Sequence, residues 1–401
     1  MLIVQKYGGT SVGSCEKIAN IANRIASAKK EGHSIVVVVS AMSGETDKLI
    51  GYSKYFNEIP DEREVDKIVS TGEIITSSLL ALALQNLGYK AIGLSGREAG
   101  VVTDCIHTKA KIQEVKKENI NQYLKDDFIV IVAGFQGIST NGEITTLGRG
   151  GSDLSAVAIA GALKADLCEI YTDVDGVFTT DPRIENKAKK IDKISYDEML
   201  ELASLGAKVL LNRSVEMAKK LNVKIITRNS FNNNDGTLIT NEEEIMEKPI
   251  ISGIALDKNQ ARISMVNVDD KPGIAALLFT SLANANINVD MIVQTIGRDG
   301  KTDIDFTIPK TDLSIAKTIL KDFEQSSQSI EFDENIAKVS IVGLGMKSHS
   351  GVASKTFSTM AKENINIMMI STSDIKISMI IDLKYAELAV RALHLAYELD
   401  K

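Results

Sequence analysis

Residues 2–13 read L-I-V-Q-K-Y-G-G-T-S-V-G, and this stretch decides how the first half of the chain folds. An apolar run typical of a buried strand leads into Lys6, a Gly-Gly pair and two hydroxyl residues, and a helical pattern then covers residues 15–31. Backbone N–H groups at such a helix start, with a fixed cation beside them, form a site suited to phosphate. An ordinary strand-to-helix turn with Lys6 in solvent explains this stretch equally well. The stretch is not a Walker A loop, because Ser14 stands where that loop's lysine belongs, and it is not G-x-G-x-x-G, because Thr10 replaces the second glycine.

Further along the chain, apolar β-branched runs alternate with helical patterns as far as residue 240. Such runs are typical of strands covered on both faces, and their alternation with helices indicates a mostly parallel sheet. The sequence therefore predicts a three-layer α/β/α sandwich over residues 1–240. The expected strands include 2–4, 34–40, 128–135, 167–173 and 223–227, and the expected helices include 15–31, 70–88 and 152–164.

The composition of the 401 residues is that of an ordinary globular protein, with 44% hydrophobic and 25% charged residues. A formal net charge of -7 disfavours binding to nucleic acid or to an anionic membrane. The cysteines, at positions 15, 105 and 168, are widely spaced and lack a C-x-x-C arrangement, so reduced thiols in a cytoplasmic protein are expected. No uninterrupted apolar run approaches the ~20 residues of a membrane span, and the four histidines show no metal-ligand spacing.

An acidic stretch with one proline, residues 241–250, is expected to be a linker, and an internal repeat follows it. A-R-I-S-M-V (261–266) is echoed by A-K-V-S-I-V (337–342), and residues 273–292 match residues 351–370 at nine of twenty aligned positions. Each copy reads strand, loop, amphipathic helix, strand, which is typical of a ferredoxin-like module. The sequence thus predicts a region of two modules over residues 251–401. The first module covers about 262–330. The second covers about 337–401 and is completed by a strand at 251–257.

A second glycine-rich stretch, T-T-L-G-R-G-G-S-D, covers residues 145–153. Its glycines let the backbone approach a ligand, and Arg149 between them can hold a carboxylate in a two-pronged contact. Ser152 and Asp153 also fit the N-cap of the next helix. A third stretch, Y-T-D-V-D-G-V-F-T-T-D-P-R (171–183), lacks the closing glutamate of a calcium loop, so a nucleotide-side loop is favoured. Shorter candidates are S-A-M-S-G-E-T (40–46), S-T-G-E (70–73) with Glu73 at a helix start, and G-A-K-V-L (206–210) with Lys208.

Taken in this order, the six motifs resemble those of the aspartokinase family within the amino-acid kinase superfamily, and the repeated modules resemble its paired ACT modules. The resemblance covers essentially the whole chain. It implies an amino-acid kinase fold followed by two ferredoxin-like ACT modules. The implied activity is transfer of the γ-phosphoryl group of ATP to the side-chain carboxylate of L-aspartate, giving 4-phospho-L-aspartate, the first step towards lysine, threonine and methionine. Since the chain stops just after the second module, a monofunctional enzyme is expected.

The resemblance also implies roles for individual residues. Lys6 would contact the transferred phosphoryl group, Arg149 the α-carboxylate of aspartate, and Glu73 its ammonium group. Magnesium is expected to arrive with ATP, with no dedicated protein ligands. One departure is that Leu211-Asn212 precede Arg213 where the family often has His-Pro. The implied catalytic residues are Lys6, Gly9, Asp153 and Lys208; the substrate-binding residues are Ser40, Thr46, Glu73, Arg149, Gly150, Gly151 and Ser152; and the ATP-binding residues are Lys6, Gly8, Gly9, Thr10, Ser11, Thr172, Asp173, Asp175, Phe178, Asp181, Arg183 and Lys208.

For the repeated modules, the resemblance implies binding of an amino-acid end product between paired modules, feedback inhibition, and a homodimer or dimer of dimers formed through them. Lysine is the leading effector, with threonine or both together as alternatives. Asp290 is replaced by Met368 in the second copy, so the two copies are not expected to be equivalent. The implied effector-binding residues are Asp270, Gly273, Asn288, Asp290, Gln294, Asn366 and Ile367.

Two other interpretations stay open on the sequence. A different small-molecule kinase of the superfamily, acting on glutamate, N-acetylglutamate, carbamate or uridylate, would lack the paired modules. A catalytically silent amino-acid sensor would keep the fold but would not need Lys6, Arg149 and Asp153, all of which are present.

Overall fold

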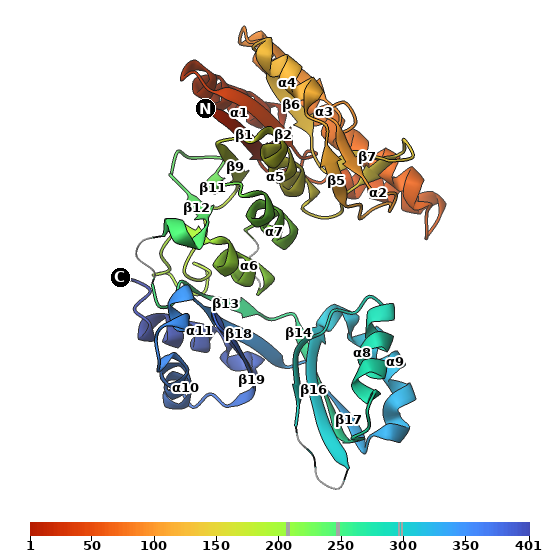
Figure 1. Cartoon of the computed structure of the whole chain (residues 1–401), viewed down its shortest axis with the longest axis vertical. Helices are drawn as coiled ribbons and strands as arrows, with labels where there is room; N and C mark the ends of the chain where they lie inside the picture. Colours follow the sequence, from red (N-terminus) through yellow and green to blue (C-terminus); the bar gives the residue numbers. More distant parts are fainter. Residues whose placement is uncertain (206–208, 246–248, 296, 298–299) are drawn as a thin grey trace. The chain divides into compact units, whose positions relative to one another are not determined.

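The computed structural model describes residues 1–205, 209–245, 249–295, 297 and 300–401. These residues form two compact units (Figure 1). Unit 1 contains Met1–Val177, Lys190–Ala203 and the described residues between 209 and 245. Unit 2 contains Phe178–Lys189 and the described residues from 249 onward, together with residues 204 and 205. A short piece of the first half of the sequence therefore folds with the second half.

The main sheet of unit 1 has eight strands among the described residues, in the order β10-β12-β11-β9-β1-β2-β6-β3. Neighbouring strands run parallel except for β11 and β12, which are antiparallel. Because parallel strands end at the same edge, the residues that follow β1, β2, β9 and β11 lie next to one another. The strands are β1 (Leu2–Tyr7), β2 (Ser34–Val39), β3 (Ala91–Leu94), β6 (Ile129–Ala133), β9 (Leu167–Thr172), β10 (Lys193–Ser195), β11 (Ile225–Asn229) and β12 (Thr237–Thr240).

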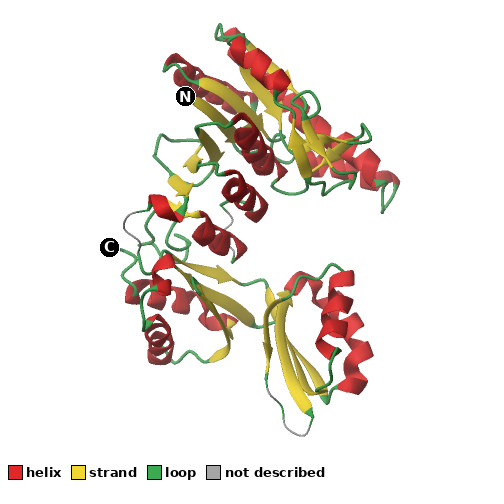
Figure 2. Ribbon diagram, in the orientation of Figure 1, coloured by secondary structure: helices red, strands yellow, loops and turns green. Residues whose placement is uncertain are grey.

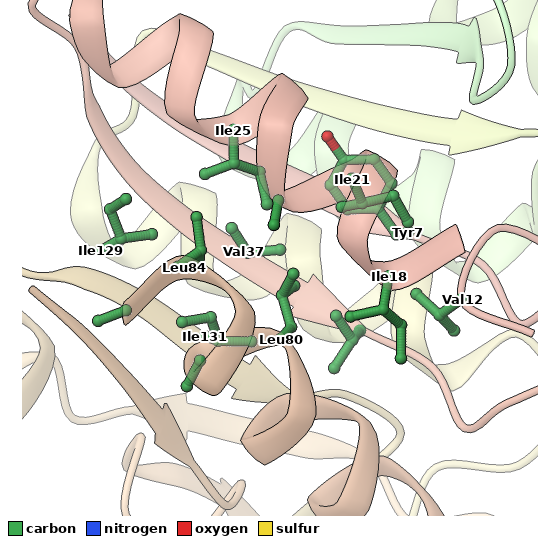
Figure 3. Close-up of a cluster of buried hydrophobic side chains, with 14 of the residues drawn as sticks. Tyr7, Val12, Ile18, Ile21, Ile25, Val37, Leu80, Leu84, Ile129 and Ile131 are labelled. Carbon is green, nitrogen blue, oxygen red and sulfur yellow. The ribbon is translucent and has the colours of Figure 1, made fainter. Parts of the chain in front are cut away.

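Helices cover both faces of this sheet, as the alternation of side chains along a strand requires. Ile35, Val37 and Val39 of β2 join a core with α1 (Cys15–Lys30) and α3 (Glu62–Asn86) (Figure 3). The intervening Val38 faces the other way, towards Ser152 of α5 (Gly151–Leu163). Remaining helices of unit 1 are α2 (Glu45–Phe56), α4 (Glu118–Lys125), α6 (Tyr196–Ser204), α7 (Asn212–Leu221) and the 3-10 turn Glu242–Glu244.

A second, smaller sheet of unit 1 leads into the glycine-rich stretch around Arg149. Its strand order is β5-β4-β7-β8, and β7 and β8 form an antiparallel hairpin in which Gln136 lies opposite Thr146. The strand β8 ends three residues before Arg149. The members are β4 (Val101–Thr103), β5 (Ile112–Val115), β7 (Gln136–Ser139) and β8 (Ile144–Thr146).

Unit 2 contains two four-stranded sheets among its described residues, each with helices packed on it (Figure 2). The first repeat copy forms the sheet β15-β16-β14-β17, and the second forms β13-β18-β20-β19, in which β13, from before the first copy, pairs with β18. Its strands are β13 (Gly253–Asp257), β14 (Gln260–Asp269), β15 (Asp290–Gln294), β16 (Lys301–Pro309), β17 (Ser329–Asp333), β18 (Ile336–Val342), β19 (Ile367–Ser373) and β20 (Lys376–Asp382). Its α-helices are α8 (Ile274–Asn284), α9 (Leu313–Leu320), α10 (Val352–Lys362) and α11 (Ala386–Ala396), with 3-10 turns at Lys310–Asp312, Lys321–Ser326, Leu344–Lys347 and Leu383–Tyr385.

The predicted fold class is confirmed, and two local predictions, on Glu73 and on the cap of α5, were wrong. Glu73 does not lie at a helix start, because Asp61 accepts hydrogen bonds from two backbone N–H groups of the first turn and α3 therefore begins at Glu62. Ser152 and Asp153 do not cap α5, because Gly150, at φ +69°, already stands at its N-cap. Thr10 and Ser11 precede α1, which begins only after the capping Ser14. Within the described ranges, α3 is the one helix long and apolar enough to cross a membrane, yet its Leu80 and Leu84 lie in the core.

Candidate active site

Lys6 and Asp153 form the centre of the candidate site. Lys6 lies near the end of β1, with its side chain on the face opposite Tyr7, and Asp153 lies in the first turn of α5. Lys6 Nζ is 2.6 Å from Asp153 Oδ1, and both side chains are 12% exposed. The ammonium group is thus held at the sheet edge by a carboxylate that also benefits from the positive end of the α5 dipole. The pair leaves Lys6 fixed and nearly buried, with N–H donors that can still meet an anion.

The glycine turn after β1 lies against the turn that follows β2. A Cβ atom on Gly9 would stand 2.9 Å from the carbonyl oxygen of Ala41, so no larger residue fits there without a shift. The N–H groups of Ser11 and Val12 both point at the Gly8 carbonyl, at 2.9 and 3.2 Å. The backbone N–H groups of Gly9 and Thr10 donate to no acceptor within the described residues. These two amides and Lys6 are the donors that the turn can offer to an anion.

Glu73 is the second buried charge of the site. Gly72 brings α3 close to the turn after β2, since a Cβ atom at Gly72 would be 2.8 Å from that of Ala41. Glu73 Oε1 accepts a hydrogen bond of 3.1 Å from the N–H of Ala41, and Oε2 is buried without a partner in the part of the chain that is described. Burial raises the pKa of Glu73 to about 7, although its backbone hydrogen bonds act in the opposite direction. A buried carboxylate oxygen without a donor is costly, so this arrangement fits a carboxylate that receives a cationic ligand.

Arg149 lies in an exposed turn that neighbouring side chains bond and pack against. The neighbouring backbone is fixed by Arg213, whose Nη1 donates to the Leu147 carbonyl at 2.8 Å. Leu211 packs against Gly150, because a Cβ atom there would be 2.8 Å from Leu211 Cδ2. The departure at Leu211-Asn212 therefore contacts the glycine-rich turn itself. Among the described residues, the Arg149 guanidinium makes no ion pair, so it is available to a carboxylate from outside the chain.

Other residues proposed for the aspartate side lie around these two charges. Ser40 follows β2, and its N–H donates to the Tyr7 carbonyl at 3.1 Å. Thr46 lies in the first turn of α2, which Gly44 begins at φ +83°. Gly151 and Ser152 form the start of α5, and a Cβ atom on Gly151 would meet Leu147 at 2.8 Å.

On the nucleotide side, Thr172 ends β9 next to β1 and Asp173 follows it, and the two side chains are hydrogen-bonded to each other at 3.0 Å. Asp175 is held differently. Its carboxylate accepts hydrogen bonds from the side-chain amides of Asn229, Asn232 and Asn234, at 2.6, 2.8 and 3.2 Å, and these bonds lower its pKa. Asp175 therefore fixes the loop after β11, and sequence reasoning missed this loop although N-S-F-N-N-N-D (229–235) is rich in amides. Ser11 also contacts it, with 2.6 Å between its Oγ and that of Ser230.

The remaining nucleotide-side candidates are not among the described residues of unit 1. Phe178, Asp181 and Arg183 belong to unit 2, where Asp181 and Arg183 form a two-pronged ion pair with Nη2 to Oδ2 at 2.7 Å. Thr179 of the same segment hydrogen-bonds His394 of α11 at 3.0 Å and accepts from the N–H of Ile254 at 2.7 Å. Lys208 lies outside the described residues.

Known proteins match this chain in sequence and in fold. Residues 1–229 match the model of the amino acid kinase family, and residues 263–322 and 339–397 each match an ACT domain model. The chain is 65% identical to an aspartokinase of Helicobacter pylori over the full length of both, and 53% identical to that of Pseudomonas aeruginosa over all of this chain and 98% of the other. This chain belongs to the aspartokinase family. It is an aspartate kinase with ACT modules, as its sequence motifs predict.

Solved aspartokinases share the fold. Aspartokinase III of E. coli in complex with aspartate and ADP (R-state) matches 99% of both chains with a TM-score of 0.83 and 25% identity. The same enzyme in complex with lysine and aspartate (T-state) matches 98% of this chain and 99% of that one, with a TM-score of 0.81 and 26% identity. The family name and these complexes place this aspartokinase in amino-acid biosynthesis under ACT-dependent regulation.

In unit 2 of this aspartokinase, the two ACT sheets contact each other where the effector residues were predicted. Met291 of β15 packs with Met369 of β19 and with Ile336 and Ile380. The strand β15, which begins at Asp290 just after Asn288, therefore lies beside β19, which begins at Ile367. Asp290 forms an ion pair with the buried Lys338 of the second copy. Burial alone would raise the pKa of Asp290, but the bond and charge of Lys338 outweigh it and the pKa is lowered.

The two ACT copies differ in how they use one repeated position. Lys338 corresponds to Arg262 of the first copy, and Arg262 pairs within its own sheet, with Nη2 2.7 Å from Asp305 Oδ1. Met368, which replaces Asp290 in the second copy, packs in the cluster between the sheets. The other predicted effector residues lie at element ends: Asp270 and Gly273 before α8, Gln294 at the end of β15, and Asn366 before β19.

Proposed function

We propose that this aspartate kinase transfers the γ-phosphoryl group of ATP to the side-chain carboxylate of L-aspartate, forming 4-phospho-L-aspartate for lysine, threonine and methionine biosynthesis. The observation that carries the proposal is the pair of charges without partners, the buried Glu73 Oε2 and the exposed Arg149 guanidinium. A free amino acid has the complementary charges, an ammonium group for Glu73 and an α-carboxylate for Arg149. This pair favours an α-amino acid over carbamate or a nucleotide as the phosphoryl acceptor.

The reaction needs little from the protein beyond alignment and charge neutralisation. The attacking β-carboxylate is already ionised at neutral pH, so no general base is required. A carboxylate oxygen forms a bond to the γ-phosphorus while the bond to the ADP oxygen breaks, and the negative charge spreads over the phosphoryl oxygens. Lys6 and the N–H groups of Gly9 and Thr10 would hold these oxygens, and Asp153 would keep Lys6 in place. Ser40, Thr46 and Ser152 would complete the aspartate side.

The nucleotide would lie along the turns after β1 and β9, with Gly8, Ser11, Thr172 and Asp173 nearest to it and Asp175 holding the outer loop. Mg²⁺ would arrive with ATP and be held mainly by its phosphates and by water. When bound, the ion would neutralise charge on the transferred group. The aspartate and ADP held by E. coli aspartokinase III support this substrate pair.

We further propose that lysine, or threonine, or both together, inhibits the enzyme by binding between the ACT modules near Asp290. The lysine complex of E. coli aspartokinase III supports an amino-acid effector. An effector can lower activity only by binding a less active arrangement better than the active one. The free cysteines Cys15, Cys105 and Cys168 fit a reducing, cytoplasmic location, and the ACT modules would also join copies of the chain.

A hydroxylamine trap for acyl phosphate tests the proposal. The enzyme with ATP and Mg²⁺ should form hydroxamate from L-aspartate and much less from L-glutamate, and lysine or threonine should suppress it. Replacement of Asp290 by Asn should weaken this suppression, whereas Met368→Leu in the second copy should not. If no substrate gives product while lysine still raises the Tm, the chain is a silent sensor and the proposal fails.

A further inference from the structure

A fully buried carboxylate outside the proposed contacts holds the strand β8, which ends three residues before Arg149. Asp66 of α3 is 0% exposed, and its oxygens face two separate loops of unit 1. Thr146 Oγ1 donates to Oδ1 at 2.5 Å, and the N–H of Thr108 lies 3.1 and 3.0 Å from the two oxygens. His107 Nδ1 is 2.8 Å from Oδ2. A buried carboxylate is tolerated only with partners of this kind, so the position of Asp66 and the position of these loops depend on each other.

The loops that Asp66 holds are the ones beneath the Arg149 turn. Thr146 is the last residue of β8, three residues before Arg149. Thr108, which adopts φ +63° although it is not glycine, places its carbonyl oxygen 3.2 Å from where a Cβ atom on Gly148 would stand. The N–H of Ala110 donates to the Thr146 carbonyl at 2.9 Å. Removal of the Asp66 contacts would therefore free both the strand end and the segment that supports Gly148.

Glu73 lies on the same helix as Asp66. The two residues are seven positions apart, so they lie on one face of α3 and about 10 Å apart along its axis. Between them, the Ser70 carbonyl accepts a hydrogen bond of 2.7 Å from Gln136 Nε2, and Gln136 lies opposite Thr146 in the β7–β8 hairpin. One helix thus carries Glu73 and is bonded twice to the hairpin that leads to Arg149.

We propose that Asp66 is a positioning residue that sets the spacing between Glu73 and Arg149, and thereby the fit of the amino-acid substrate. The inference rests on the proposed roles of those two residues. Asp66 itself does not contact the substrate. It acts through Thr146 and Thr108, and the Gln136–Ser70 bond limits how far the hairpin can slide along α3.

The test compares Thr146→Val with Thr146→Ser in the full-length enzyme, with KM for aspartate and KM for ATP measured separately. Valine keeps the shape of threonine but removes the hydroxyl donor to Asp66, while serine keeps the donor. We expect Thr146→Val to raise KM for aspartate ~10-fold and to leave KM for ATP within ~2-fold, because loss of one hydrogen bond to a charge is of that size. Thr146→Ser should retain KM for aspartate within ~2-fold of wild type.

Asp66→Asn is the more severe variant, since its amide would place N–H donors against the N–H of Thr108. It should raise KM for aspartate further if it folds. The proposal is overturned if Thr146→Val is folded by Tm and keeps both KM values, or if it changes both KM values equally. Glu73→Gln distinguishes a failure of the proposed substrate site from a failure of the positioning role. If Glu73→Gln leaves KM for aspartate unchanged, the proposed substrate site fails; if only Thr146→Val leaves it unchanged, the positioning role fails.

Discussion

The phosphoryl side and the aspartate side of the candidate active site balance their charges in opposite ways. On the phosphoryl side, Lys6 is paired with Asp153 at 2.6 Å, and both are nearly buried. On the aspartate side, Glu73 Oε2 is buried without a partner, and Arg149 makes no ion pair within the described residues. The contrast follows from the group that each side is proposed to bind, a phosphate on one side and a free amino acid on the other. Phosphate brings a large negative charge that a fixed cation must meet without rearranging, whereas a zwitterion brings one charge for each free group.

The difference also separates the effects expected from mutation. Groups on the phosphoryl side should act mainly on kcat, because they are proposed to meet charge that develops during transfer. Groups on the aspartate side should act mainly on KM for aspartate, because they are proposed to bind charges that do not change in the reaction.

Replacement of Lys6 by Met should give the largest effect, a fall in kcat of ~1,000-fold or more, because the fixed cation of the phosphoryl side is lost. Steady-state hydroxamate rates measure it. Lys17→Met is a matched control, since Lys17 Nζ bonds the Thr10 carbonyl of the same turn at 2.9 Å but is not in the Lys6–Asp153 pair. A Lys6→Met enzyme within ~10-fold of the Lys17→Met enzyme would remove Lys6 from the mechanism.

Replacement of Glu73 by Gln should raise KM for aspartate ~100-fold while KM for ATP stays within ~2-fold. The neutral amide keeps the size of the side chain but loses the charge for the ammonium group, an interaction of about 2–3 kcal/mol. Glu62→Gln, an exposed position in the first turn of the same helix, is the control and should match wild type. An increase in KM for ATP as large as that for aspartate would contradict the assignment of Glu73 to one side.

KM for aspartate should depend on pH through Glu73, whose pKa is raised to about 7. Below this value the carboxyl is protonated and neutral, so aspartate should bind ~10-fold more weakly at pH 6 than at pH 8. The measurement is KM for aspartate between pH 6 and 8, with KM for ATP as the internal reference. The Glu73→Gln profile should be flat over this range, and a wild-type profile that is also flat would show that Glu73 does not titrate there.

The smallest expected effect is on stability. The pKa of Glu73 is raised on folding from 4.5 to about 7, so the folded state holds a proton that the unfolded state has lost, and stability falls as pH rises through that range. The uncompensated charge costs on the order of 3 kcal/mol above pH 7, by the usual conversion of pKa into free energy. Glu73→Gln should therefore raise the Tm by a few degrees at pH 8 and not at pH 4.5. Saturating aspartate should remove this advantage, and a lower Tm at pH 8 would contradict it.

The sequence predicted the sandwich and the repeat and drew attention to the charged candidates, because these depend on local patterns. The apolar runs of β1, β2, β6, β9 and β11 are visible directly, and an arginine among three glycines is uncommon enough to be noticed. The start of α3 was missed because S-T-G-E resembles a helix start, while Asp61 caps the helix three turns earlier. Asp66 was missed because its partners, Thr108 and Thr146, are 42 and 80 residues away. Contacts at that separation have no local pattern.

Residues 178–189 fold with unit 2 although they follow the nucleotide-side loop in sequence. Ile184 packs on the core of the second ACT module, and Thr179 is bonded to Ile254 and His394 from that module. A gene cut near residue 245 would therefore part the second ACT module from residues 178–189, which pack on it. The N-terminal fragment would expose Ile184 and leave the backbone of Thr179 without its strand partner, and the C-terminal fragment would lack a piece of its own core. For protein engineering, residues 178–189 are therefore best exchanged together with the ACT region, because they contact its second module.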